Sequence, residues 1–108
     1  MIKVTFTKSD KKLSLRVEGH AEYAEHGKDI VCASASILAS VFAVTILECD
    51  EVYEVDSIVD LTSGNVIIEC NCKSEEAYVK VANAYHYTKL GFELLAHDYS
   101  QYVRLMES

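Results

Sequence analysis

The sequence predicts a two-layer α+β domain of order ββαββα(β), with a mainly antiparallel sheet and two helices. Short segments in both halves of the chain alternate apolar and polar residues, as half-buried strands do. Two longer segments, beginning near residues 30 and 75, have the apolar character of helices. Because 108 residues support one hydrophobic core, we expect a single domain over residues 1–108.

The first two strands are predicted to form a hairpin that leads into a loop. Apolar and polar residues alternate over 2–7 and again over 13–17, and residues 8–11 have the composition of a turn. Gly19 ends the second strand. Residues 19–29 (GHAEYAEHGKD) are polar and without a clear period. We therefore expect a mobile loop between the hairpin and the next element.

Residues 30–47 contain no charged side chain, although the chain has a net charge of −7. Their length is near that of a membrane span, but Ser and Thr interrupt the run and no cluster of Lys or Arg flanks it. The run also begins too far along the chain for a signal peptide. We therefore expect a core helix over about 30–49, with Asp29 as its N-cap and no membrane contact.

Small residues mark one face of this predicted helix. Ala35, Ala39 and Ala43 recur at every fourth position, which lets another backbone approach closely. We expect this face to lie against the sheet or against a partner chain.

The second half of the chain repeats the order of two strands and a helix. We expect a third strand over 53–61, a turn at 62–65, a fourth strand over 66–72, a helix over 75–98 and a short last strand over 99–106. Ser74 precedes two acidic residues, which is typical of a helix start. The residues of that helix that we expect to be buried lie on one face. They are Tyr78, Val81, Tyr85, Thr88, Phe92 and Leu95.

Composition excludes some classes of function. The acidic chain argues against a general nucleic-acid binder, which needs basic surface. The four cysteines, at positions 32, 49, 70 and 72, lack the paired spacing of a zinc site. We expect reduced thiols in the cytoplasm, no metal and no cofactor. The acidic segment 48–60 has two interpretations, a solvated surface or an attractor of a Lys-rich partner.

One constellation has the properties of a nucleophilic site. With Asp29 as N-cap, Cys32 falls in the first helical turn, where free backbone N–H groups and the helix dipole favour a thiolate. A folded-back loop would let His20 act as base and acid, and His26 is also available. We favour His20 because it ends a strand, which fixes its position better. The alternative is that Cys32 is a packing residue.

Residues 19–36, GHAEYAEHGKDIVCASAS, resemble the signature of the ribosomal-processing cysteine proteases (Prp). That signature has a Gly-His pair, then Asp-Ile-Val-Cys-Ala, with Ser four positions after the Cys. The resemblance implies that Cys32 is the nucleophile and His20 its general base and acid. It also marks Gly19, Asp29 and Ser36 as supporting or substrate-positioning residues.

The physical interpretation of these supporting residues agrees in part. Gly19 lets the chain turn into the loop. Asp29 has two interpretations: it only caps the helix, or it caps the helix and also holds the loop. Ser36 lies one turn after Cys32 and either positions the catalytic groups or is a small packing residue. One position departs from the family pattern, since Ser34 stands where the family often has Gly.

The resemblance further implies a substrate and a mechanism. The substrate would be ribosomal protein number twenty-seven of the large subunit, cleaved after an aromatic residue of its apolar N-terminal extension to leave a Lys-rich mature end. We expect acyl transfer by a Cys–His dyad in a homodimeric family member. Backbone N–H groups at the helix start, including that of Cys32, would hold the oxyanion. The alternative is a non-enzymatic dimeric ribosome-assembly or interaction module, whose interface is the small-residue helix face.

Overall fold

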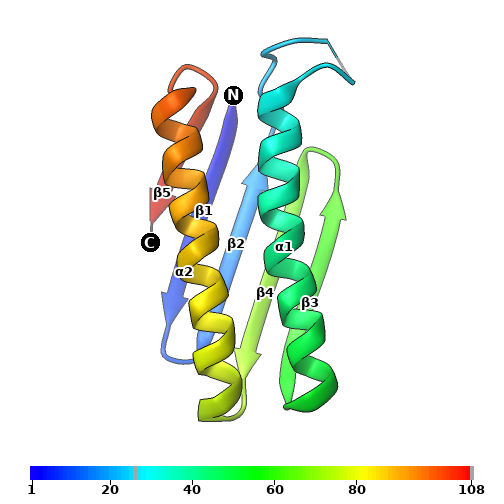
Figure 1. The fold of residues 1–108 in the computed structure, drawn as a ribbon, viewed down its shortest axis with the longest axis vertical. Coiled ribbons are helices and arrows are strands. Elements are labelled where there is room, and N and C mark those ends of the chain that lie inside the picture. Colours follow the sequence, from blue (N-terminus) through cyan, green and yellow to red (C-terminus); the bar gives the residue numbers. More distant parts are fainter. Residues whose placement is uncertain (26, 108) are drawn as a thin grey trace.

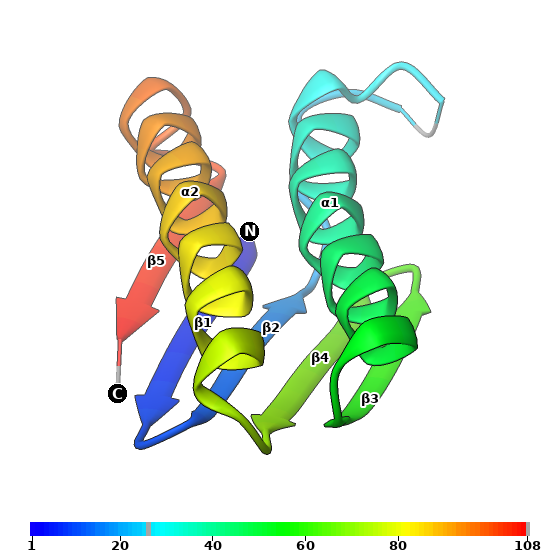
Figure 2. The ribbon, with the colours of Figure 1, turned by 60° about the horizontal axis from the view of Figure 1, so that its bottom comes forward.

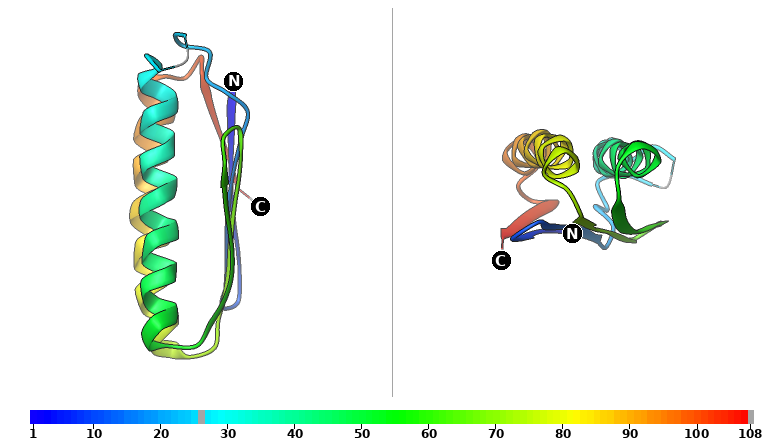
Figure 3. Two further views of the ribbon diagram at one scale, coloured as in Figure 1. Left: turned by 90° about the vertical axis from the view of Figure 1, so that its right-hand side faces the viewer. Right: turned by 90° about the horizontal axis from the view of Figure 1, so that it is seen from below.

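The computed structural model describes residues 1–25 and 27–107. Within them the chain forms a five-stranded sheet with two helices on one face (Figures 1 and 3). The helices are α1 (Ile30–Val52) and α2 (Glu75–Asp98). The strands are β1 (Ile2–Ser9), β2 (Lys12–Glu18), β3 (Val55–Thr62), β4 (Asn65–Cys72) and β5 (Val103–Glu107). The predicted two-layer α+β architecture is confirmed.

The sheet has the strand order β3-β4-β2-β1-β5. The pairs β1–β2, β2–β4 and β3–β4 are antiparallel, while β5 pairs parallel with β1. The sheet is therefore mixed and mainly antiparallel, as predicted. The last strand begins later than expected, because the Val103 N–H donates to the Tyr99 carbonyl in a turn after α2 (3.1 Å).

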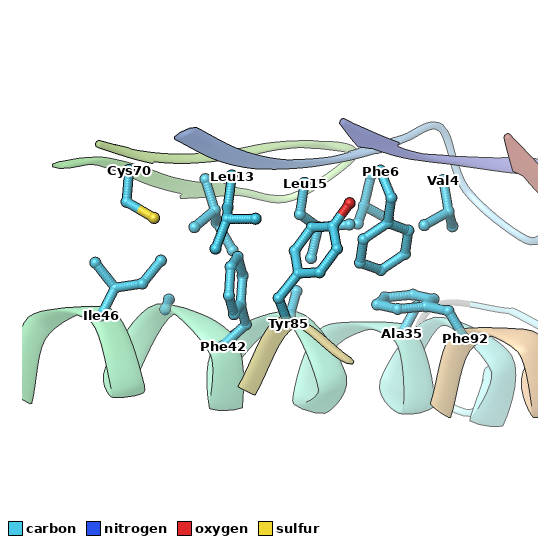
Figure 4. Close-up of a cluster of buried hydrophobic side chains, with 14 of the residues drawn as sticks. Val4, Phe6, Leu13, Leu15, Ala35, Phe42, Ile46, Cys70, Tyr85 and Phe92 are labelled. Atoms are coloured by element: carbon cyan, nitrogen blue, oxygen red, sulfur yellow. The ribbon is translucent and has the colours of Figure 1, made fainter. Parts of the chain in front are cut away.

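The core lies between the helices and the inner face of the sheet (Figure 4). Antiparallel pairing places Phe6 opposite Leu15, so the alternating residues of the hairpin enter one layer. Phe6 meets Tyr85 and Phe92 edge-to-face, with ring centroids 5.2 and 5.8 Å apart. The opposite face of the sheet carries no helix in the described part of the chain (Figure 3).

The helix α1 packs its small-residue face onto the sheet. Ala35, Ala39 and Ala43 are at most 3% exposed, so this face belongs to the chain's own core and is closed to a partner. By length and composition alone, α1 is long and apolar enough to cross a membrane. It also runs to Val52, three residues beyond the predicted end, because no Gly or Pro interrupts it and the Tyr53 N–H still bonds Cys49 (2.7 Å).

The fold brings three segments to one end of the molecule. The helices run antiparallel, and α1 lies on the β3 side of the sheet while α2 lies on the β5 side (Figures 1 and 2). The start of α1 therefore lies at the same end as the loop after β2 and the turn between β3 and β4 (Figure 1). A backbone hydrogen bond joins this turn to the loop, from the Gly19 N–H to the Gly64 carbonyl (2.9 Å).

Candidate active site

The Asp29 carboxylate joins the loop to the helix. One oxygen, Oδ1, accepts the N–H groups of Val31 and Cys32, each at 3.0 Å, which is the predicted N-cap. The other oxygen, Oδ2, accepts the N–H groups of Tyr23 (3.0 Å) and Ala24 (3.3 Å) in the loop. Asp29 therefore caps the helix and also holds the loop, which the sequence alone left open.

These contacts change the acidity of Asp29. Partial burial raises the pKa of its carboxyl group, but the four backbone N–H donors together lower it more. The net pKa lies below the ordinary value of 3.8, so the side chain is a carboxylate throughout the neutral range.

Cys32 lies in the first turn of α1 and is half-buried. Its sulfur accepts a hydrogen bond from the backbone N–H of Ala21, with a distance of 3.3 Å from N to Sγ. Ala21 is only 2% exposed, so this donor is shielded from bulk water. A shielded N–H aimed at the sulfur stabilises negative charge there.

His20 is the first residue after the glycine that ends β2, and it is exposed. Its backbone carbonyl accepts a hydrogen bond from the Met1 amino group (2.7 Å). Its imidazole lies beside Gly64 in the β3–β4 turn. The closeness is such that a Cβ added to Gly64 would stand 2.7 Å from the His20 Nε2 atom. The base candidate is therefore held between the start of β1 and the tip of the β3–β4 turn.

Cys32 and His20 line one pocket of about 460 Å³. The pocket residues are His20, Glu22, Ala24, Gly27, Asp29, Cys32, Ala33, Ser36 and Ser63. A larger concavity of about 740 Å³ lies on the uncovered face of the sheet and contains neither His20 nor Cys32. The smaller pocket is the candidate active site, because it combines a thiol, an imidazole and a helix start.

Four of the five sequence-predicted site residues line this pocket, and Gly19 stands outside it. Gly19 has a φ of +89°, and a Cβ there would approach the Met1 carbonyl oxygen to 2.5 Å. It therefore serves the path of the chain. Ser36 is exposed at the wall of the pocket, which places it near Cys32 and leaves its role a prediction. The competing base candidate, His26, lies outside the described residues.

Two features of the resting site differ from expectation. The Cys32 N–H already donates to Asp29, so it does not offer the free oxyanion donor that its place in the helix suggested. Among the described residues, no hydrogen bond joins the His20 imidazole to the Cys32 sulfur. The imidazole and the sulfur must come within hydrogen-bond distance of one another before a proton can pass between them.

Sequence reasoning missed the backbone of Ala21 and the turn residues Ser63 and Gly64. Ala21 acts through its N–H, a group that every residue except proline carries, so no residue type marks it. The turn lies more than thirty residues further along the chain and reaches the pocket only through strand pairing. In the sequence, the glycine at position 64 predicts a turn and nothing more.

The three other thiols lie in the core. Cys49, Cys70 and Cys72 are at most 6% exposed. Burial is the main cause that raises the pKa of each, to about 12 for Cys70. At neutral pH these cysteines are neutral, shielded thiols.

The fold and the pocket define a class of small α+β proteins with a cysteine and a histidine at the start of a core helix. The family model described as cysteine protease Prp matches residues 1–104, and the chain belongs to this family. The ribosomal processing cysteine protease Prp of Bacillus subtilis (strain 168) is 45% identical over 51 residues. That match covers 44% of this chain and 46% of the relative, about half the relative's own length.

Solved structures share the fold. The essential ribosomal processing protease Prp from S. aureus, in complex with a substrate peptide, matches with a TM-score of 0.72, 22% identity and full coverage of both chains. The protein SMU.848 from Streptococcus mutans matches with a TM-score of 0.68 and 26% identity, over this whole chain and 96% of that one.

The four cysteines should differ in reactivity. Cys32 should be the thiol that iodoacetamide modifies first at pH 7, because it is half-buried while burial shields the others and raises their pKa values. Peptide mapping by mass spectrometry after brief exposure gives the order, with Cys32→Ser as the control. Equal modification of all four thiols would contradict the predicted site.

The two roles of Asp29 should separate in Asp29→Asn. The amide keeps one acceptor oxygen, so the N–H groups of Val31 and Cys32 should stay protected. Its NH₂ cannot accept, so the N–H groups of Tyr23 and Ala24 should exchange with solvent about tenfold faster. Hydrogen exchange by NMR measures all four, and Asp29→Ala, which loses both roles, is the control.

The charge of Asp29 should also make stability depend on pH. Its pKa is lowered in the folded state, so its stabilisation is complete above the unfolded value and is lost as pH falls through the folded value. The unfolding midpoint of wild type should therefore exceed that of Asp29→Asn at pH 7 and approach it in strong acid. A difference that persists unchanged into acid would contradict the charge assignment.

Proposed function

We propose that this chain is a cysteine endopeptidase that acts in the cytoplasm. In this proposal it removes the N-terminal extension of ribosomal protein number twenty-seven of the large subunit. The observation that carries the proposal is that Cys32, in the first turn of α1, and His20 line one pocket. Support for a peptide substrate comes from the S. aureus relatives, which are described with a substrate peptide and with a covalently linked product peptide.

The first half of the reaction forms an acyl-enzyme. The Cys32 thiolate attacks the scissile carbonyl carbon, and the new C–S bond leaves an oxyanion on the carbonyl oxygen. The His20 imidazolium then protonates the leaving amine as the C–N bond breaks. The Lys-rich mature protein leaves with that new amino group, and the extension remains as a thioester on Cys32.

Hydrolysis completes the cycle. His20, now neutral, takes a proton from a water molecule that attacks the thioester carbonyl. The extension leaves as a carboxylic acid, the sulfur departs as the thiolate, and the imidazolium is restored. No third titratable residue enters this cycle, so the pair acts as a dyad with Asp29 holding its geometry.

The oxyanion needs a donor close to the sulfur. The Cys32 N–H is occupied by Asp29, whereas the Ala21 N–H points at the sulfur from 3.3 Å. When the thiolate attacks, negative charge moves from the Cys32 sulfur to the carbonyl oxygen of the substrate, which lies beside the sulfur. The Ala21 N–H is a donor within reach of this oxygen. Fixation of the loop by Asp29 keeps this N–H in place.

The charge of the pocket suits the proposed product side of the substrate. Glu22 and Asp29 line the pocket together with Cys32. A Lys-rich segment following the cleavage point would meet these carboxylates at close range. The acidic residues of segment 48–60 lie further along α1 and on β3.

A cleavage assay tests the proposal. The substrate is a peptide with an apolar leader, an aromatic residue and then Ala-Lys, and products are identified by mass spectrometry. Wild type should cleave after the aromatic residue, while Cys32→Ala should lose cleavage by at least about a thousandfold because no nucleophile remains. His20→Ala should lose about a hundredfold or more through loss of acid–base catalysis.

Ser36→Ala, at the pocket wall, is measured in the same assay. A loss of cleavage would assign Ser36 to positioning the dyad, and unchanged cleavage would assign it to packing. Intact peptide after incubation with wild type would overturn the protease proposal. Undiminished cleavage by Cys32→Ala would overturn the assignment of Cys32 as the nucleophile. An intact peptide with wild type would favour the alternative, a non-enzymatic dimeric interaction module. The structural support for that alternative is weak, since the small-residue face expected as its interface is buried in the chain's own core.

We also propose that two copies associate through the outer surface of α1. Ile37, Val41 and Val44 follow one another on this helix at helical spacing and are 62%, 55% and 51% exposed. A contiguous exposed apolar stripe of this kind is typical of an interaction surface. A second copy of the chain would cover it with an equivalent stripe.

Light scattering after size-exclusion chromatography should therefore give twice the chain mass of 12.1 kDa. Ile37→Lys should shift the protein to monomer, because a charge in an apolar interface is desolvated without a partner. Ile58→Lys is the matched control, since Ile58 is equally exposed at 60% but lines the concavity on the uncovered sheet face. A monomeric wild type, or a dimeric Ile37→Lys, would contradict this proposal.

A further inference from the structure

The tip of the β3–β4 turn touches the candidate base. Gly64 has no side chain, and the His20 imidazole occupies the space where one would stand. A Cβ on Gly64 would lie 2.7 Å from Nε2 and 3.1 Å from Cε1 of that ring. Carbon atoms do not approach a ring so closely, so any other residue at this position must displace the imidazole.

We propose that Gly64 is a positioning residue for His20, an inference that rests on the proposed protease function. The missing side chain lets the imidazole lie against the turn and face the pocket that contains Cys32. Gly64 thereby acts through His20. The neighbouring residue Ser63 lines the same pocket, so the turn is part of its wall.

The backbone of Gly64 supports this role from a second side. Its carbonyl accepts the N–H of Gly19, the residue directly before His20, at 2.9 Å. One residue of the turn therefore bonds the backbone that leads into His20 and leaves room for the His20 ring. Because strand pairing of β3 with β4 holds the turn rigid, the imidazole gains a firm support although it is exposed.

Gly64 has a competing explanation, which the test must separate from the proposal. Its φ is +79°, a conformation that favours glycine whatever lies nearby. Gly27 has a similar φ of +88° but nothing within 4 Å of an added Cβ. Gly27→Ala therefore measures backbone strain alone, and Gly64→Ala measures strain together with the clash against His20.

A double-mutant cycle isolates the clash. Chemical unfolding is measured for wild type, Gly64→Ala, His20→Ala and the double variant. Removing the ring should remove the clash, so Gly64→Ala should destabilise the wild-type background more than the His20→Ala background. In the latter, its effect should fall to that of Gly27→Ala. Because the ring is the far end of an exposed side chain, it can move aside at little cost, and this difference should be small. Equal effects in both backgrounds together with an unchanged NMR signal of the His20 ring would overturn the proposal.

The second measurement follows the imidazole itself and needs no cleavage. NMR of ring-labelled histidine should show a shifted His20 signal in Gly64→Ala, with the signals of His86 and His97 unchanged. In the cleavage assay, kcat should fall by roughly a hundredfold with a much smaller change in KM, since a displacement of about 1 Å suffices for such a loss.

The outcomes distinguish the two proposals. If wild type fails to cleave the peptide, the proposed protease function is wrong. The double-mutant cycle of unfolding and the NMR signal of His20 still decide whether Gly64 positions His20. If wild type cleaves and Gly64→Ala keeps both its kcat and an unchanged His20 signal, the protease function stands and the role of Gly64 is wrong.

Discussion

The Asp29 carboxylate accepts four backbone N–H groups, two from the first turn of α1 and two from the preceding loop. Because one charged group accepts hydrogen bonds from both segments, it holds the loop against the start of the helix. The loop in turn carries Ala21, whose N–H reaches the Cys32 sulfur, and begins at His20. The arrangement of nucleophile, donor and base therefore depends on one ionised side chain.

That carboxylate works because α1 is packed into the core along its length. The small face of the helix lets it lie close to the sheet, and its buried residues share a core with both the hairpin and α2 (Figure 4). The first turn thus presents its N–H groups from a fixed place. The same packing separates the thiols, since three lie in the core while Cys32 stands at the exposed end of the helix.

The β3–β4 turn gives the site a third component. It meets His20 through Gly64 and the pocket through Ser63, although it belongs to the edge of the sheet. An exposed histidine on a loop would otherwise sample many positions, which slows any reaction that needs a fixed geometry. The turn and the Asp29 carboxylate hold the loop at two points, Gly19 and residues 23–24.

The sequence alone determined the strands of the hairpin, both helix starts and the buried face of α2, because these depend on local periodicity and on capping residues such as Asp29 and Ser74. It also indicated Cys32 and His20, mostly through the resemblance of one short motif. The contacts of Ala21, Ser63 and Gly64 are different in kind. They consist of a backbone N–H, a pocket wall and a missing side chain, and each acquires meaning only when distant segments meet. Tertiary structure decided them because a backbone group or an empty space carries no residue-specific signal.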